Sequence, residues 1–158
     1  MRTLDYLRLD ENKVANVTNA LQQLLADYQV FYANLRGFHW NIKGHAFFVL
    51  HSKFEELYNN VSEKADEIAE RILTLGATPK NRLSDYAKDA KIEEVEGVSC
   101  ANKALANVLQ TYGLLIEEER SILSLASEAG DEATVAMMSD YVREQEKLVW
   151  MLTAYAAE

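Results

Sequence analysis

The sequence is poor in the residues that interrupt or cross-link a chain. It has one cysteine, one proline and six glycines among 158 residues. A single cysteine, Cys100, excludes an intrachain disulfide framework and a cysteine-rich zinc site. With 49% hydrophobic residues, the composition also excludes a disordered or collagen-like chain. The length suits one domain with a sizeable core, so residues 1–158 are expected to form a single unit.

Basic residues and long apolar runs are also scarce. Lysine and arginine number 16 against 25 acidic residues, which gives a net charge of −9. A surface this negative argues against a basic footprint for nucleic acid and suits a protein that handles cations. No stretch approaches the length of a membrane-spanning helix, and residues 1–10 lack the apolar run of a signal peptide. The expectation is therefore a cytoplasmic protein with no membrane partner.

Four long segments repeat their apolar residues at helical spacing. They cover roughly residues 10–38, 46–75, 100–129 and 131–156, and Asp10 is the expected N-cap of the first. The connection between the second and third contains Pro79 and a short helix expected over 83–88. One long connection among short ones is typical of ferritin-like bundles. The predicted fold is all-α: a ferritin-like four-helix bundle with a long middle crossover containing a short helix.

All three histidines lie close together around the first predicted turn. His39 and His51 are equally far from His45, so an antiparallel hairpin places them at similar height on adjacent helices. Glu55 follows His51 by four residues and shares its helix face. We therefore expect His39, His51 and Glu55 to converge on one metal ion. His45 is interpreted as a residue of the turn, not as a ligand.

A second pair of carboxylates, Asp66 and Glu70, falls on nearly the same face further along that helix. Asp66 is about 22 Å from His51 along the helix axis, too far for one chain to complete the site. The midpoint of residues 51 and 70 is also the midpoint of 55 and 66. An antiparallel second copy would therefore set His51 opposite Glu70 and Glu55 opposite Asp66. Two identical sites would form at a twofold interface.

Two imidazoles and three carboxylates suit Fe(II), with Zn, Co or Mn as competitors. The alternative interpretation is simpler, because charged pairs four residues apart usually belong to a solvated helix face. An iron centre inside one bundle is not expected, since no glutamate precedes a histidine by three residues.

Two segments resemble a known family closely. They are F-H-W-N-I-K-G-H-A-F-F-V-L-H-S-K-F-E-E-L-Y (38–58) and D-E-I-A-E-R-I-L-T-L-G-A (66–77), and both are similar to the Dps family of mini-ferritins. The similarity extends over nearly the whole chain, through E-x-E-K-x-x-W-M-L at its C-terminal end. The resemblance implies a ferroxidase that forms a shell of twelve subunits. It would oxidise Fe(II), preferentially with hydrogen peroxide, and store the ferric product inside.

The same resemblance suggests roles for individual residues. It carries the iron ligands over onto His39, His51, Asp66 and Glu70, while the family often has aspartate where this chain has Glu55. Trp40 corresponds to a site-adjacent tryptophan that donates electrons, although a tryptophan there is equally an apolar anchor.

Three acidic residues precede or begin the last predicted helix. Acidic side chains there complement the helix dipole, and in the family this region borders threefold pores that admit cations. We expect a pore role for Asp131 first, then for Glu128 and Glu132. The run Glu117 to Glu119 is interpreted as a solvated or interior-facing acidic surface.

The chain departs from the family in its tails. Many Dps proteins bind DNA through a lysine-rich tail, whereas Arg2 and Arg8 are here balanced by Asp5 and Asp10. We expect no direct DNA binding, and DNA protection by removal of Fe(II) and peroxide. Two rivals remain: a nucleoid-associated protein that compacts DNA and binds metal incidentally, and a metal-free helical scaffold.

Overall fold

The computed structural model describes residues 2–157. Helices make up most of that range, and no residue within it belongs to a strand. In chain order the helices are α1 (Thr3–Leu7), α2 (Glu11–Asn41), α3 (Phe47–Thr74), α4 (Leu83–Asp89), α5 (Ala101–Ala129) and α6 (Glu132–Ala156).

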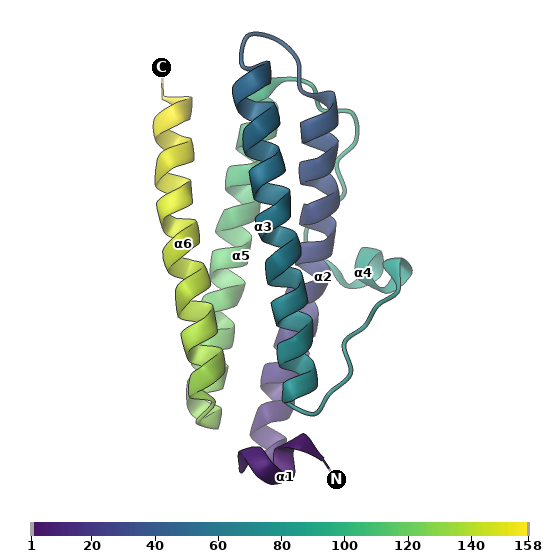
Figure 1. Cartoon of the computed structure of the whole chain (residues 1–158), viewed down its shortest axis with the longest axis vertical. Helices are drawn as coiled ribbons and strands as arrows, with labels where there is room; N and C mark the ends of the chain where they lie inside the picture. Colours follow the sequence, from purple (N-terminus) through teal and green to yellow (C-terminus); the bar gives the residue numbers. More distant parts are fainter. Residues whose placement is uncertain (1, 158) are drawn as a thin grey trace.

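Two antiparallel hairpins form the bundle (Figure 1). Helices α2 and α3 make one hairpin and α5 and α6 the other, and α2 also packs against α5. The connection from α3 to α5 runs from one end of the bundle to the other and carries α4 on its way. The predicted fold class is confirmed, including the long crossover and its short helix.

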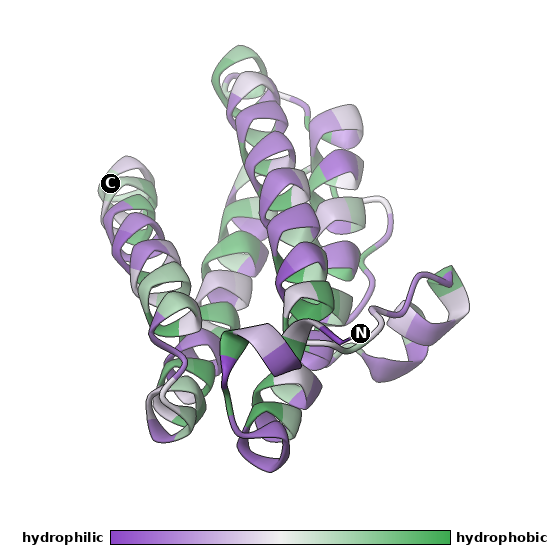
Figure 2. Cartoon of the chain, turned by 60° about the horizontal axis from the view of Figure 1, so that its bottom comes forward, coloured by the Kyte–Doolittle hydropathy of each residue, from purple (hydrophilic) through white to green (hydrophobic). Residues whose placement is uncertain are grey.

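Apolar side chains from all four long helices fill the space between them. Figure 2 shows hydrophobic residues turned toward the bundle axis and hydrophilic ones turned outward. The largest side chains with almost no exposed surface include Phe31 and Phe38 on α2, Phe54 on α3 and Tyr112 on α5. The ring of Phe31 meets that of Tyr112 edge to face, with centroids 5.1 Å apart. This contact joins the two hairpins.

Polar side chains of α2 hold the crossover in place. The buried carboxylate of Asp27 accepts hydrogen bonds from the backbone N–H groups of Lys91 and Ile92 at 2.7 and 2.8 Å. The side-chain amide of Asn34 donates to the backbone carbonyl of Glu93 at 2.9 Å. Because the crossover has no regular structure here, these side chains satisfy backbone groups that would otherwise lack partners.

The helix ends follow ordinary capping rules. Asp10 is the N-cap of α2, as predicted, and its carboxylate accepts from the N–H groups of Asn12 and Lys13. Gly130, at φ 70°, ends α5 in the left-handed conformation that glycine adopts without strain. Helix α1 was not predicted, because its five residues are too few to show a period. Within residues 2–157 no helix is long and apolar enough to cross a membrane.

Candidate metal site

His39 and His51 form a closed pair at the corner between α2 and α3. Their imidazole rings stack with centroids 3.7 Å apart and planes inclined by 19°. The Nδ1 atom of His39 lies 2.8 Å from the backbone carbonyl oxygen of His51. The Nδ1 atom of His51 lies 2.8 Å from the backbone carbonyl oxygen of His39. The prediction that the two histidines lie at the same height on adjacent helices is confirmed.

These two hydrogen bonds decide which ring nitrogens remain free. A carbonyl oxygen only accepts, so Nδ1 must carry the proton in both rings. Each neutral imidazole then keeps its lone pair on Nε2. Histidines that bind metals commonly donate their other N–H to a carbonyl in this way, which fixes the ring and its tautomer. The pair therefore offers two oriented nitrogen donors.

The three predicted carboxylates are exposed on α3. Within the described residues, Glu55, Asp66 and Glu70 have no side-chain hydrogen bond and no basic partner. Their neighbours differ: Glu56 pairs with Lys53 at 2.7 Å, and Glu67 accepts a hydrogen bond from the hydroxyl of Tyr141. The predicted ligands are thus carboxylates that the chain itself leaves available.

One chain does not bring the ligands together. Across residues 2–157, no three histidine, cysteine, aspartate or glutamate side chains lie close enough to hold a metal ion. The expected convergence of His39, His51 and Glu55 is therefore not seen within one chain, and the site shared between two chains stays a prediction.

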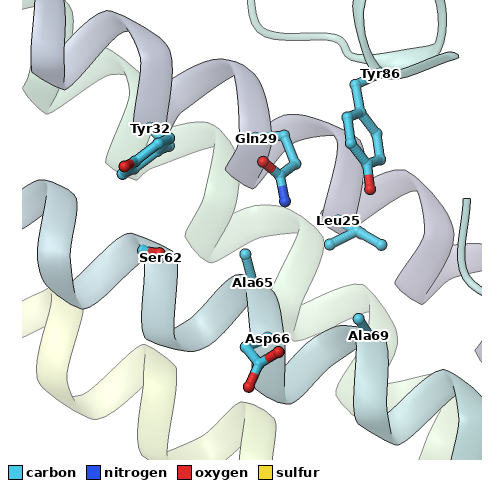
Figure 3. A pocket seen from close by; sticks show the side chains of 8 residues that line it. All are labelled: Leu25, Gln29, Tyr32, Ser62, Ala65, Asp66, Ala69 and Tyr86. Atoms are coloured by element: carbon cyan, nitrogen blue, oxygen red, sulfur yellow. The ribbon is translucent and has the colours of Figure 1, made fainter. Parts of the chain in front are cut away.

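Asp66 and Glu70 lie beside two hollows on either side of α3. Asp66 borders a pocket of about 270 Å³, whose opposite walls include Tyr32 of α2 and Tyr86 of α4 (Figure 3). Glu70 borders an open groove of about 650 Å³ between α3 and α6. A second helix laid along α3 would therefore meet both carboxylates.

On α3, Val49, Glu56, Glu63 and Glu67 are exposed along a neighbouring face, and eight further exposed residues form one ridge. They recur every three or four positions, as expected for one helix face. The ridge comprises Phe48, Ser52, Glu55, Asn59, Ser62, Asp66, Glu70 and Leu73. Its two large apolar members, Phe48 at 84% exposure and Leu73 at 52%, lie equally far from the midpoint between Asn60 and Val61. That midpoint is also the one about which the predicted ligands are arranged.

Trp40 lies beside the histidine pair but does not stack on it. Its side chain is 63% exposed, and the guanidinium carbon of Arg36 lies 4.6 Å from its ring centroid. The aromatic neighbour of His39 on the other helix is Tyr58, whose ring meets the imidazole edge to face at 5.4 Å. The electron-donor role predicted for Trp40 stays a prediction.

The three residues predicted for a pore differ in their surroundings. Asp131 is buried, caps α6 through the N–H of Thr134 and pairs with Arg71 at 2.5 Å. Glu128 and Glu132 are exposed. The dipole and capping role of Asp131 is therefore visible in a single chain, whereas the pore role of all three stays a prediction.

Sequence reasoning missed a polar cluster inside the bundle. Glu119, interpreted as part of an acidic surface, has no exposed area. Its Oε1 accepts hydrogen bonds from the Tyr28 hydroxyl at 2.6 Å and from Nε2 of Gln145 at 2.7 Å. Its Oε2 has no partner among the described residues. Burial raises the pKa of this carboxyl to about 7. The spacing of Glu119 from Leu115 and Ile122, both buried, is the signal that could have revealed its position.

Comparison with known proteins agrees with this architecture. The model of a family described as "Ferritin-like domain" matches residues 18–158. A DNA protection during starvation protein from Porphyromonas gingivalis is 50% identical over 157 residues, which cover 99% of each chain.

Two solved structures are similar in both sequence and shape. A Dps protein from Vibrio cholerae, described as a member of a broad superfamily of ferritin-like diiron-carboxylate proteins, has 50% identity and a TM-score of 0.93, with 94% of each chain covered. A Dps protein from Bacillus brevis has 36% identity and a TM-score of 0.89, covering 92% of this chain and 98% of its own. With its bundle, its crossover and relatives matched over nearly their full length, the chain belongs to the Dps family of ferritin-like proteins.

Proposed function

We propose that this protein is a ferroxidase that detoxifies and stores iron. Fe(II) is its substrate and hydrogen peroxide its preferred oxidant. The ferric product collects as mineral inside a shell of twelve copies. The observation that carries the proposal is the reciprocal pair of hydrogen bonds between His39 and His51, which leaves both Nε2 atoms free as ligands.

The proposed ligands contribute to Fe(II) binding in different ways. The two imidazoles supply oriented neutral donors, and Glu55 supplies negative charge one turn along α3. Asp66 and Glu70 of a second copy complete a mixed nitrogen and oxygen site that suits Fe(II) and admits Zn, Co or Mn as competitors. One peroxide takes one electron from each of two Fe(II) ions, its O–O bond breaks, and two hydroxide ions leave.

The ridge on α3 supports the twofold arrangement. A second copy that sets His51 opposite Glu70 also sets Phe48 opposite Leu73, so that two exposed apolar side chains cover each other. Burial of apolar surface is the main driving force of such contacts. The polar ligands then lie in the same seam, flanked at both ends by these apolar contacts.

A matched set of histidine variants tests the site. We expect His39→Ala with His51→Ala to abolish the fast phase of peroxide-driven Fe(II) oxidation and to leave the shell assembled, because the ligands occupy only a small part of any subunit contact. His45→Ala is the control, since His45 is an exposed turn residue of the same type. Stopped-flow absorbance and size-exclusion chromatography measure the two properties. Wild-type initial rates in the double variant would contradict the assigned site.

A second candidate function, direct DNA binding, would be one way to provide the DNA protection that the name of the P. gingivalis relative states. The charges of this chain point the other way. Arg2, near the N-terminus, already pairs with Asp5 at 3.1 Å and Glu11 at 3.0 Å. We propose that DNA is protected indirectly, through the removal of Fe(II) and peroxide.

The prediction for DNA is the absence of a complex. At 0.15 M salt and neutral pH, without divalent cations, we expect no retardation of linear duplex DNA in a mobility-shift assay. An acidic shell repels phosphates, and phosphate contacts dominate DNA affinity. A retarded band whose intensity falls steeply with salt would favour the nucleoid-associated alternative.

A further inference from the structure

The pocket beside Asp66 contains polar side chains that the rest of the chain does not engage. Gln29 of α2 and Ser62 of α3 line this space of about 270 Å³. The amide of Gln29 points from α2 toward α3 (Figure 3). Within residues 2–157 neither side chain makes a hydrogen bond, whereas Gln23, earlier on the same helix, donates two at 2.7 and 2.8 Å. The pocket therefore offers a ligand one amide and one hydroxyl, with a carboxylate at its rim.

Small side chains on α3 create this pocket. Ser62, Ala65 and Ala69 recur three and four positions apart and line the pocket on the side of α3 (Figure 3), so no bulky side chain of α3 fills the space between the helices. On the opposite side, the hydroxyl of Tyr86 donates to the backbone carbonyl of Lys80 at 2.5 Å and is not available to a ligand. A water molecule takes about 30 Å³ of liquid volume, so the pocket has room for a ligand of a few heavy atoms together with water.

The pocket lies on the same flank of α3 as the histidine pair. Its walls include α2 and α3, and the ring of His51 also turns toward α2, where it stacks on that of His39 at 3.7 Å. A twofold axis perpendicular to two antiparallel α3 helices keeps each flank on its own side of the dimer. In the proposed dimer, Asp66 faces Glu55 of the second copy. The pocket of one copy therefore opens beside the site that contains the histidines of the other.

We propose that this pocket binds hydrogen peroxide before it reacts with Fe(II), and that Gln29 and Ser62 select peroxide over dioxygen. The inference rests on the proposed ferroxidase function, to which it adds a binding place for the oxidant. Iron and oxidant then have separate places: the imidazoles and carboxylates of the seam hold Fe(II), and peroxide reaches it past the rim at Asp66.

The selection follows from hydrogen-bonding capacity. Hydrogen peroxide has two O–H donors and lone pairs on both oxygens. The amide of Gln29 accepts through its carbonyl and donates through its NH₂ group, and the hydroxyl of Ser62 does both. Dioxygen has no proton to donate and is a poor acceptor, so these groups give it no comparable affinity. The pocket therefore raises the concentration of peroxide beside the iron without doing the same for dioxygen.

Stopped-flow oxidation of the assembled protein, loaded anaerobically with Fe(II), tests the pocket. Gln29→Leu keeps the size of the side chain and removes its hydrogen bonds. We expect it to raise the peroxide concentration for half-maximal rate by about tenfold, with the maximal rate unchanged. Ser62→Ala should cause a smaller rise. With dioxygen as the oxidant, both variants should react at the wild-type rate. Gln110→Leu and Ser139→Ala, at exposed positions of α5 and α6, are the matched controls.

The possible failures are distinguishable. An unchanged half-saturating concentration in Gln29→Leu, equal losses with peroxide and dioxygen, or a wild-type rate that never saturates with peroxide overturns the pocket. An absence of peroxide-driven Fe(II) oxidation in the wild-type protein overturns the ferroxidase function itself. If Gln29→Leu does not assemble, Ala69→Val narrows the same pocket from α3. It should also raise the half-saturating concentration of peroxide, and a wild-type value in that variant would overturn the proposal.

Discussion

Glu119 places an ionisable group at the centre of the bundle, where no water solvates a charge. Burial raises its pKa to about 7, while the Tyr28 and Gln145 hydrogen bonds and the nearby Lys64 act in the opposite direction. Burial has the larger effect because only one carboxyl oxygen finds donors. A carboxyl with one bare oxygen is more stable with a proton there than with a charge.

This pKa predicts how stability depends on pH. The folded protein keeps the Glu119 proton up to about pH 7, whereas the unfolded chain releases it near pH 4.5. The contribution of Glu119 to stability is therefore complete below about pH 4.5 and is lost as the pH rises to about 7, by an amount on the order of 3 kcal/mol. Urea unfolding at several pH values measures it. Glu119→Gln removes the titrating group, so its profile should be flatter than wild type over this interval. Parallel profiles would contradict the raised pKa.

Helix α2 does more than contribute apolar surface, because it fixes the path of the crossover. Asp27 is the main example: one carboxylate oxygen serves two consecutive backbone N–H groups, those of Lys91 and Ile92. These donors belong to a segment with no regular structure here, so no helix or sheet partner is available to replace the side chain. The position of the crossover therefore depends on single side chains of another element.

Removal of that carboxylate should be costly. We expect Asp27→Ala to lower the free energy of unfolding by about 2–4 kcal/mol, because it leaves two N–H groups without an acceptor. Asp27→Asn keeps a side-chain oxygen and should retain part of the stability. Asp140→Ala is the control, since Asp140 is an exposed aspartate. Urea unfolding gives the energies, and amide exchange at Lys91 and Ile92 locates the effect. Equal losses of unfolding free energy in Asp27→Ala and Asp140→Ala would show that the hydrogen bonds from Asp27 to the crossover contribute nothing to stability.

The four long helices could be predicted from the sequence because each repeats its apolar residues at helical spacing. The proximity of His39 and His51 followed from the same reasoning, since positions equally far from a turn pair in an antiparallel hairpin. Their reciprocal hydrogen bonds could not be predicted, because they depend on side-chain rotamers. Glu119 was misplaced because a run of three glutamates usually lies in water. That Glu119 lies on the buried face of α5 can be inferred only from its spacing to the apolar residues on either side.

At the scale of the whole molecule, the site is expected to depend on two copies of the chain. His51 and Glu70 lie on one helix, yet 19 residues at 1.5 Å each separate them by about 28 Å. Within the described part of one chain, no three candidate ligands meet. In the proposed dimer, each copy contributes its histidines to one site and its Asp66 and Glu70 to the other.

Complementation between two inactive variants tests this sharing. Glu70→Ala and His51→Ala should each lack activity as homo-oligomers. In a mixed dimer both defects fall on the same site, and the other site is intact. Co-refolded variants should recover about half of the wild-type rate if every dimer is mixed and about a quarter if pairing is random. Stopped-flow Fe(II) oxidation with peroxide gives the rate.

The control for this experiment is Glu56→Ala mixed with His51→Ala. Glu56 is an exposed glutamate on α3 that pairs with Lys53 and is not a predicted ligand. Glu56→Ala should be fully active alone. In its mixture with His51→Ala, the fraction of active sites should equal the fraction of chains that keep His51. No recovery in the Glu70→Ala mixture, with mixed assembly verified by mass spectrometry, would place each site within one chain.

The histidine pair has a consequence for how an ion enters the site. Each ring is already held by the carbonyl of the other helix, so little conformational entropy remains to be lost when Nε2 binds a metal. Within residues 2–157, Glu55, Asp66 and Glu70 pair with no other side chain, so most of the ordering on metal binding would fall on these carboxylates. In the proposed function, the two imidazoles would fix the geometry around the ion, while the mobile carboxylates would determine how quickly the ion is exchanged. Such a division would suit the proposed function, in which the site passes its ferric product to a growing mineral after every turnover.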